Sequence, residues 1–211
     1  MNRIVLLGDS IIDNGAYVRP GEPDVTRQVQ ERLPGATVIK RALDGAKVEN
    51  VLRDQLNDLA SEDFIVLSVG GNDALDHIGL LEQSSKVKYL QALNKLWDIR
   101  KGFEAQYRRL MERIAEKQPD PAKVTVMTIY DPCFVGSSYP EEYQKAAEAA
   151  VSIFNDVIQR EAARMGYTVI ELRELFTDKG DYANPIEPSA QGGKKIAEAL
   201  ADWTGRVSRQ R

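Results

Sequence analysis

A serine and an asparagine stand directly after two apolar segments of the sequence, where polar side chains can form a site. Ser10 ends a Gly-Asp-Ser turn after the apolar run 4–7. A serine there can point its hydroxyl into a cleft in which backbone N–H groups hold an anion. Asn72 follows the apolar run 64–69, and its amide could donate a hydrogen bond to a developing oxyanion. Both residue types also form ordinary turns and caps, so neither alone indicates catalysis.

Three other groups of reactive side chains carry weaker signals. His77, the only histidine, lies five residues after Asn72 and could act as a base, although a solvated loop histidine is the plainer interpretation. Cys133 is the only cysteine and has no histidine near it in sequence to activate its thiol. Asp9 and Asp13 could form a paired-acid metal site, but the sequence has neither a GxxxxGK phosphate loop nor a His or Cys cluster. We therefore expect no metal and no other cofactor.

The composition is that of an ordinary globular protein and excludes several classes of function. The 211 residues suit one compact domain, so we expect residues 1–211 to form a single domain. A net charge of −4 without a basic stripe argues against a nucleic-acid partner. One cysteine permits no internal disulfide, and no apolar stretch approaches the roughly 18 residues that a membrane span needs. Because the N-terminal apolar run is too short for a signal peptide, the sequence indicates a cytoplasmic protein without a membrane span.

Five short apolar runs predict the strands that would position these side chains. The runs are residues 4–7, 37–39, 64–69, 124–129 and 168–172. Amphipathic patterns predict helices over residues 24–33, 48–59, 103–118, 141–165 and 189–206, with a shorter helix around 89–97. Continuous apolar runs, rather than alternating ones, are typical of parallel strands buried on both faces. The sequence therefore predicts a three-layer, doubly wound α/β sandwich with a five-stranded parallel sheet.

The carboxyl ends of parallel strands meet at one edge of the sheet, where ligands bind in such folds. We therefore expect Ser10, Gly45, Asn72 and the loop 181–188 to converge at that edge.

Two segments are the expected rim loops over a pocket at this edge, residues 77–100 and 130–140. In the second, Tyr130, Phe134 and Tyr139 could line an acyl pocket, and ordinary packing at the rim explains them equally well.

Taken together, these residues resemble the sequence blocks of a known enzyme family. The Gly-Asp-Ser turn at Ser10, Gly45 and the Gly-Asn-Asp segment at Asn72 are similar, in order and spacing, to the first three blocks of the SGNH (GDSL-type) hydrolases. Residues 189–200 resemble the helix that follows the family's last block. The resemblance implies a flavodoxin-like fold and a lipase- or esterase-like hydrolase of small ester substrates. It also implies Ser10 as the nucleophile, with oxyanion donors from the backbone N–H groups of Ser10 and Gly45 and from the Asn72 side chain.

The last block departs from the family pattern. Where the family has an Asp, two spacer residues and a His, this sequence has Asn184, two spacers and Glu187. A carboxylate can accept the serine proton and later return it to a leaving alkoxide, and burial would raise its reference pKa of about 4.3 toward neutrality. Asn184 could donate a hydrogen bond to that carboxylate, whereas an Asp would repel it. We therefore interpret Asn184 and Glu187 as a mutually compatible replacement in an ester hydrolase.

The alternative is a catalytically silent protein of the same fold. In that case both last-block positions drifted after catalysis was lost, and the pocket binds an acyl, ester or sugar ligand without cleaving it. The two hypotheses differ in whether Ser10 reacts.

Overall fold

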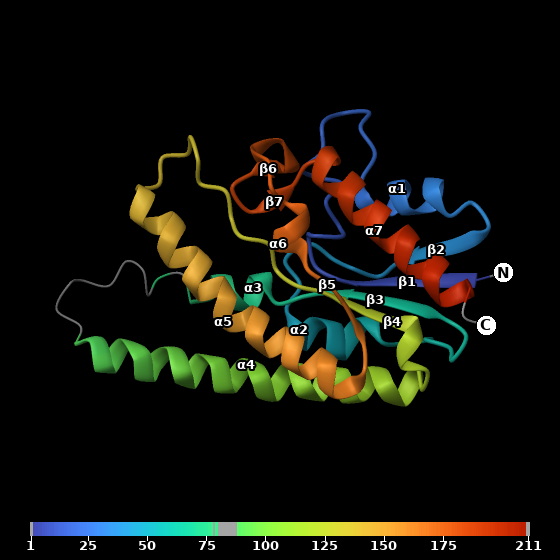
Figure 1. The fold of residues 1–211 in the computed structure, drawn as a ribbon, viewed down its shortest axis with the longest axis horizontal. Helices are drawn as coiled ribbons and strands as arrows, with labels where there is room; N and C mark the ends of the chain where they lie inside the picture. Colours follow the sequence, from blue (N-terminus) through green and yellow to red (C-terminus); the bar gives the residue numbers. More distant parts are fainter. Residues whose placement is uncertain (1, 78, 80–87, 210–211) are drawn as a thin grey trace.

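The computed structural model describes residues 2–77, 79 and 88–209 and has a five-stranded sheet at its centre (Figure 1). Its strands are β1 (Asn2–Gly8), β2 (Ala36–Lys40), β3 (Phe64–Ser68), β4 (Val124–Met127) and β5 (Thr168–Ile170). They pair in the order β2-β1-β3-β4-β5, and every pairing is parallel. The predicted doubly wound sheet is confirmed.

Alternate residues of the central strands supply two separate hydrophobic cores. Val5 and Leu7 of β1 point to one face of the sheet, and Ile4 and Leu6 point to the other. Successive side chains of a strand point in opposite directions, so a strand buried on both faces must be apolar at every position. This is why the strands read as continuous apolar runs in the sequence.

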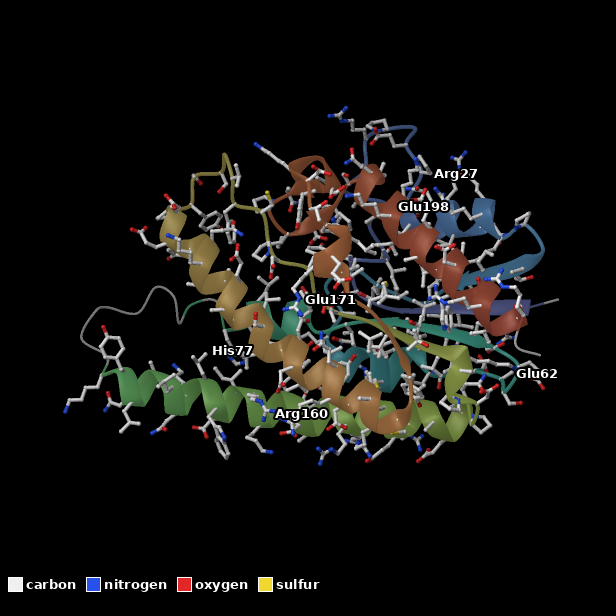
Figure 2. All side chains as sticks on the ribbon, viewed as in Figure 1. Arg27, Glu62, His77, Arg160, Glu171 and Glu198 are labelled. Atoms are coloured by element: carbon white, nitrogen blue, oxygen red, sulfur yellow. The ribbon has the colours of Figure 1, made fainter. Side chains whose placement is uncertain are left out.

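Helices cover both faces of the sheet. They are α1 (Val25–Arg32), α2 (Val48–Asn50), α3 (Gly71–Leu75), α4 (Tyr89–Lys117), α5 (Glu141–Met165), α6 (Leu172–Leu175) and α7 (Ala190–Arg209). Helices α4 and α5 pack on the face that contains Val5, whereas α1 and α7 pack on the face that contains Ile4. Arg27 of α1 and Glu198 of α7 lie on the outer surface of their layer (Figure 2).

Of the two long helices, α5 matches its predicted bounds and α4 does not. Helix α5 has the bounds that the sequence predicts, and Gly166 ends it in the left-handed conformation, with a φ of 71°. Helix α4 is one helix of 29 residues, whereas the sequence pattern suggested two. Its first turns do not pack on the sheet, so they lack the buried apolar stripe by which a sequence pattern reveals a helix.

Several short elements complete the chain. They are a π-helical turn (Val51–Gln55), two 3₁₀ turns (Pro121–Lys123 and Lys179–Asp181), and the antiparallel strands β6 (Tyr182–Asn184) and β7 (Glu187–Pro188). The sequence analysis did not predict the β6–β7 hairpin. Over the part of the chain that the structure describes, none of the helices combines the length and apolar character needed to cross a membrane.

Candidate active site

Ser10 is held at the carboxyl edge of the sheet by the glycine that ends β1. A side chain at Gly8 would place its Cβ 1.8 Å from the carbonyl oxygen of Ser68, so only glycine lets β1 pass this close to β3. The Gln55 side chain brackets the same residue: the Gly8 N–H donates to its Oε1 at 2.8 Å, and its Nε2 donates to the Gly8 carbonyl at 2.9 Å. These contacts fix the turn on which Ser10 sits.

Asp9 organises this turn from within the protein. Its Oδ1 accepts the Ile11 N–H at 3.1 Å, and its side chain is almost fully buried. The pKa of Asp9 is raised to about 8, mainly by burial and to a smaller extent by the charges of Glu187 and Asp73, against the lowering effect of the Ile11 hydrogen bond. Asp9 is therefore mostly protonated at neutral pH and adds little negative charge beside Ser10.

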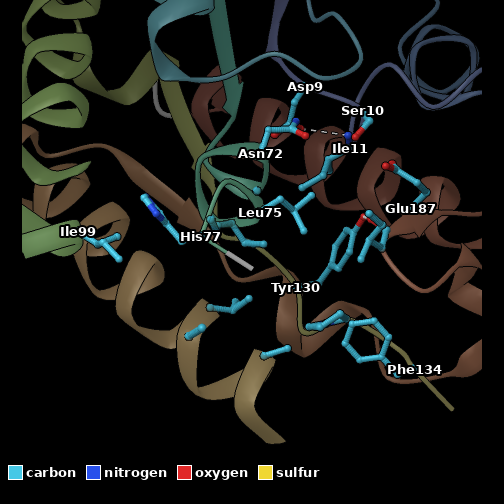
Figure 3. A pocket seen from close by; sticks show the side chains of 18 of the residues that line it. Asp9, Ser10, Ile11, Asn72, Leu75, His77, Ile99, Tyr130, Phe134 and Glu187 are labelled. Atoms are coloured by element: carbon cyan, nitrogen blue, oxygen red, sulfur yellow. Dashed lines mark hydrogen bonds between the residues drawn. The ribbon is translucent and has the colours of Figure 1, made fainter. Parts of the chain in front are cut away.

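Asn72 lies on α3, directly after β3, and faces the same cavity as Ser10 (Figure 3). Its Nδ2 donates to the Ala46 carbonyl at 3.1 Å. An amide nitrogen carries two hydrogens, and a second one remains for a ligand. Its neighbour Asp73 accepts the Val48 N–H at 3.2 Å, so both side chains tie α3 to the turn before α2.

Gly45 lies within that turn but outside the cavity lining. The turn is closed by a hydrogen bond from the Ala46 N–H to the Leu43 carbonyl at 3.0 Å, and Gly45 itself is exposed. The structure thus places Gly45 next to the contact between Ala46 and Asn72. An oxyanion contact from its N–H stays a prediction.

Glu187, on β7, is buried beside Ser10 at the mouth of the cavity (Figure 3). Its pKa is raised from 4.5 to about 7, mainly by burial and to a smaller extent by the charge of Asp44, against a lowering effect of the Ser10 side chain. Its Oε2 is buried and has no hydrogen-bond partner among the described residues. Glu187 is therefore a carboxylate that burial has tuned toward neutrality and whose second oxygen faces no protein donor.

Asn184 does not support Glu187 in the way the sequence suggested. The two residues pair across the β6–β7 hairpin through their backbones, but Asn184 is exposed and its Oδ1 accepts the Ile186 N–H at 3.0 Å. Within the described part of the chain, no side-chain hydrogen bond joins the two. The expectation is corrected because Asn184 is used in a local turn, as asparagine often is.

The hairpin that carries Glu187 is instead held by the loop after β4. The Tyr130 hydroxyl donates to the Ile186 carbonyl at 2.7 Å, and the Tyr182 hydroxyl donates to the Asp131 carbonyl at 2.7 Å. The Cys133 N–H donates to the Pro185 carbonyl at 2.8 Å. Sequence reasoning missed Tyr130 in this role, because nothing local marks a tyrosine that anchors a segment 56 residues away.

The cavity has a volume of about 140 Å³ and becomes apolar beyond Ser10 and Glu187. Of the three rim aromatics that the sequence singled out, Tyr130 and Phe134 line it, whereas Tyr139 lies outside the lining and is half exposed. Alanines also line the cavity, and sequence reasoning did not identify them. Alanine is common in any helix because it favours helix formation, so its presence does not indicate a cavity wall.

His77 lines the far end of this cavity, beside Ile99 and away from Ser10 (Figure 3). It is exposed, as the sequence suggested for a rim residue. Residues 78 and 80–87, which belong to the first expected rim loop, lie outside the described residues. Among the residues that are described, no group of His, Cys, Asp and Glu side chains could hold a metal ion.

Comparison with known proteins identifies relatives over nearly the whole chain. The model of the GDSL-like lipase/acylhydrolase family matches residues 6–195. No curated protein matches the chain.

Several solved structures share the fold. An extracellular lipase from Streptomyces rimosus is 20% identical with a TM-score of 0.69, and the match covers 96% of this chain and 99% of the lipase. A phospholipase A1 from Streptomyces albidoflavus is 17% identical with a TM-score of 0.68, covering 96% and 98%. An acetylxylan esterase from Geobacillus stearothermophilus is 16% identical with a TM-score of 0.63, covering 96% and 94%.

Proposed function

Because the chain belongs to the GDSL-like lipase/acylhydrolase family, we propose that it hydrolyses carboxylic esters with Ser10 as nucleophile and Glu187 as base. The observation that carries this proposal is the pairing of Ser10 with Glu187 at the mouth of an apolar cavity. A serine beside a carboxylate that can act as its base is the minimum arrangement for acyl transfer through a serine.

In this mechanism Ser10 attacks the ester carbonyl carbon while Glu187 accepts the proton of its hydroxyl. The negative charge that develops on the carbonyl oxygen is held by the Asn72 amide and by the backbone N–H groups of Ser10 and Gly45. When the intermediate collapses, the protonated Glu187 returns its proton to the leaving alkoxide and an acyl-serine remains. Water then attacks the acyl-serine, with Glu187 again as base, and releases the acid.

The raised pKa of Glu187 supports its assignment as the base. A carboxylate with an ordinary pKa of 4.5 accepts a serine proton poorly near neutrality, whereas one with a pKa of about 7 is matched to that pH. The charged form of Glu187 is needed, so turnover should rise as the pH rises through about 7. Since a histidine titrates near pH 6.5, this inflection alone does not distinguish the two bases.

A silent binding protein is the competing proposal, and one observation favours it. The Oε2 of Glu187 has no partner among the described residues, and Asn184 does not orient the carboxylate. A base that no neighbouring group orients is positioned less precisely toward the serine hydroxyl than the histidine of a triad is. In this alternative the cavity binds its ligand and Ser10 does not react.

Labelling with a fluorophosphonate separates the two proposals. The wild-type protein should gain the mass of one phosphonyl group on the peptide that contains Ser10, and it should hydrolyse p-nitrophenyl butyrate. Ser10→Ala should lose both properties, whereas Ser152→Ala, which removes an exposed hydroxyl of α5, should keep both. Wild-type protein that is neither labelled nor active, with its fold intact, would overturn the hydrolase proposal in favour of a binding protein.

A further inference from the structure

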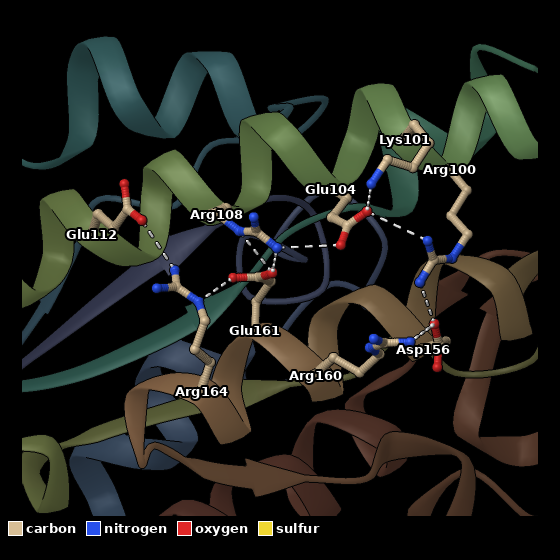
Figure 4. A network of polar contacts seen from close by, with 9 residues as sticks. All are labelled: Arg100, Lys101, Glu104, Arg108, Glu112, Asp156, Arg160, Glu161 and Arg164. Atoms are coloured by element: carbon tan, nitrogen blue, oxygen red, sulfur yellow. Dashed lines mark hydrogen bonds and ion pairs between the residues drawn. The ribbon is translucent and has the colours of Figure 1, made fainter.

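Helices α4 and α5 are joined along only part of their length. A network of ion pairs connects them, with Arg100 of α4 bonded to Asp156 of α5 at 2.8 Å and Arg108 bonded to the buried Glu161 at 2.7 Å (Figure 4). Arg164 of α5 extends the network to Glu112 of α4 at 3.2 Å. These contacts hold α4, from Arg100 onward, against the C-terminal half of α5.

The turns that precede Arg100 in α4 and Asp156 in α5 instead border the cavity that begins at Ser10. Leu96 and Ile99 of α4 and Ala147 and Ala150 of α5 line it. No ion pair joins the helices there among the residues described, and Figure 1 shows the two helices diverging toward their N-termini. The cavity therefore occupies the space that opens beyond the ion-pair network.

The α5 wall of this space is built from the small side chains of Ala147, Ala150 and Val151, two of which end at Cβ. Ala147 and Ala150 are three residues apart and so lie on the same face of the helix, whereas Ala149 is exposed on another face. Any longer side chain on the inner face would extend into the cavity. These two alanines thus leave open the part of the cavity that lies beside α5.

The surroundings of Ser10 outside the cavity are polar. Tyr17 and Asp44 do not line the cavity, and the Tyr17 hydroxyl donates to the Asp44 carboxylate at 2.7 Å. The Asp44 N–H donates to Asp13 at 3.0 Å, and the Asp44 charge is close enough to Glu187 to raise its pKa. An ester at Ser10 thus has an apolar cavity for one part and a polar, exposed surface for the other.

We propose that the cavity between α4 and α5 is an acyl-chain chamber, whose capacity Ala147 and Ala150 set, and that the preferred substrates are esters of unbranched fatty acids. The proposal rests on the proposed reaction at Ser10. The apolar chain enters the chamber, and the alcohol part lies toward Tyr17 and Asp44. Each methylene that the chamber buries should raise kcat/KM by roughly two- to fourfold, until the chain reaches its end.

The first test compares chain-length profiles of matched alanine variants. The ratio of kcat/KM for p-nitrophenyl octanoate to that for the acetate is measured in wild type, Ala150→Leu and Ala149→Leu. The ratio should be high in wild type and fall about tenfold or more in Ala150→Leu, because the leucine fills the space of several methylenes. Ala149→Leu makes the same change on the outer face and should keep the wild-type ratio.

Ala147→Leu serves as a second inner-face variant should Ala150→Leu fail to fold, as judged by thermal unfolding. A wild-type preference for acetyl esters, or an equal ratio in folded inner-face and outer-face variants, would overturn the chamber. Alkyl acetates of increasing alcohol length are assayed in parallel. Ala150→Leu could change kcat/KM across the alkyl acetates and leave the acyl chain-length profile unchanged. That result would mean that the cavity holds the alcohol part, and the acyl assignment would be wrong.

A binding measurement separates this proposal from the proposed reaction. Calorimetric titration of Ser10→Ala with butyrate, octanoate and dodecanoate needs no turnover. Affinity should rise with chain length, and the rise should stop at a shorter chain when Ala150→Leu is added. That result would support the chamber even if wild type hydrolyses no ester. An affinity that is flat across the series would overturn the chamber even if short esters are cleaved.

Discussion

The two sides of the candidate site are held in place by different forces. On the side of the loops after β1 and β3, directional hydrogen bonds fix Ser10 and Asn72: Gln55 brackets Gly8, and Asn72 donates to Ala46. On the side of the β6–β7 hairpin, hydrogen bonds such as that from Tyr130 hold the backbone, whereas the Glu187 side chain is held by burial and its Oε2 has no partner among the described residues. The first side presents residues that hydrogen bonds hold in position, and the second presents a buried carboxylate whose surroundings raise its pKa.

This difference suggests how the site functions without a histidine beside Ser10. Donors that receive developing charge must be rigid, because stabilisation of the oxyanion depends on their position. A base depends on its pKa and its distance from the serine, and burial is the main cause that raises the pKa of Glu187 to about 7. Mutations on the hydrogen-bonded side should therefore change activity by moving the donors. Mutations on the hairpin side should change the pH dependence of activity.

Asn72→Ala should have the largest effect on the hydrogen-bonded side. Loss of an oxyanion donor should lower kcat for p-nitrophenyl butyrate by about 10²- to 10³-fold and change KM little. Steady-state kinetics together with thermal unfolding would check this, since the variant also loses the bond to the Ala46 carbonyl. A folded Asn72→Ala protein with wild-type kcat would remove Asn72 from the mechanism.

Asp9→Asn should change the pH dependence of stability. The pKa of Asp9 is about 8 in the folded protein and 3.8 as an ordinary value, so the folded state holds an extra proton between these limits. The free energy of unfolding should therefore fall as the pH rises from about 4 to 8, by at most about 1.4 kcal/mol per pH unit from this group.

Asp9→Asn stays neutral and should flatten that slope, which urea unfolding at several pH values would measure. Glu187→Gln is the matched control from the hairpin side. It should remove a smaller contribution over a narrower range, because the pKa of Glu187 rises only from 4.5 to about 7. An unchanged slope in Asp9→Asn would show that Asp9 is not held protonated.

His77→Ala should have a small effect, within about threefold on kcat/KM, because His77 lies at the opposite end of the cavity from Ser10. The same esterase assay would measure it. Loss of all activity in a folded His77→Ala protein would mean that the only histidine, rather than Glu187, is the base.

Asn184→Ala should have the smallest effect, with kcat within about twofold of wild type. Its side chain is exposed and bonds only the Ile186 N–H in the described structure, so its loss removes a turn contact and leaves Glu187 in place. A large fall in kcat would restore Asn184 as a residue that orients the base.

The sheet could be predicted well from the sequence because burial on both faces leaves a strong local signal. The run from Phe64 to Ser68 is apolar up to its last residue and fully buried, and the other strands were placed by the same reasoning. Helix α5 was placed with its bounds because Gly166 marks its end. The first turns of α4 pack against little, so their pattern gave no comparable signal.

Only the parts of the candidate site that short sequence motifs mark could be predicted from the sequence. The positions of Ser10 and Asn72 follow from the strands that precede them. The support of the hairpin by Tyr130, and the space that Ala147 and Ala150 leave open in the cavity, depend on contacts between distant segments. The hydrogen bond expected from Asn184 is missing in the described structure because a local turn competes for the side chain, and a spacing pattern does not reveal that competition.

The most direct test of the account is the pH dependence of p-nitrophenyl butyrate hydrolysis by wild type and by Glu187→Gln. In wild type, kcat/KM should rise with pH through an inflection near 7, as the Glu187 carboxylate ionises. Glu187→Gln should lower kcat/KM by about 10²-fold and abolish the inflection, because the amide neither accepts the serine proton nor titrates. Ser10-dependent turnover that keeps both its rate and its inflection in Glu187→Gln would contradict the assignment of Glu187 as the base.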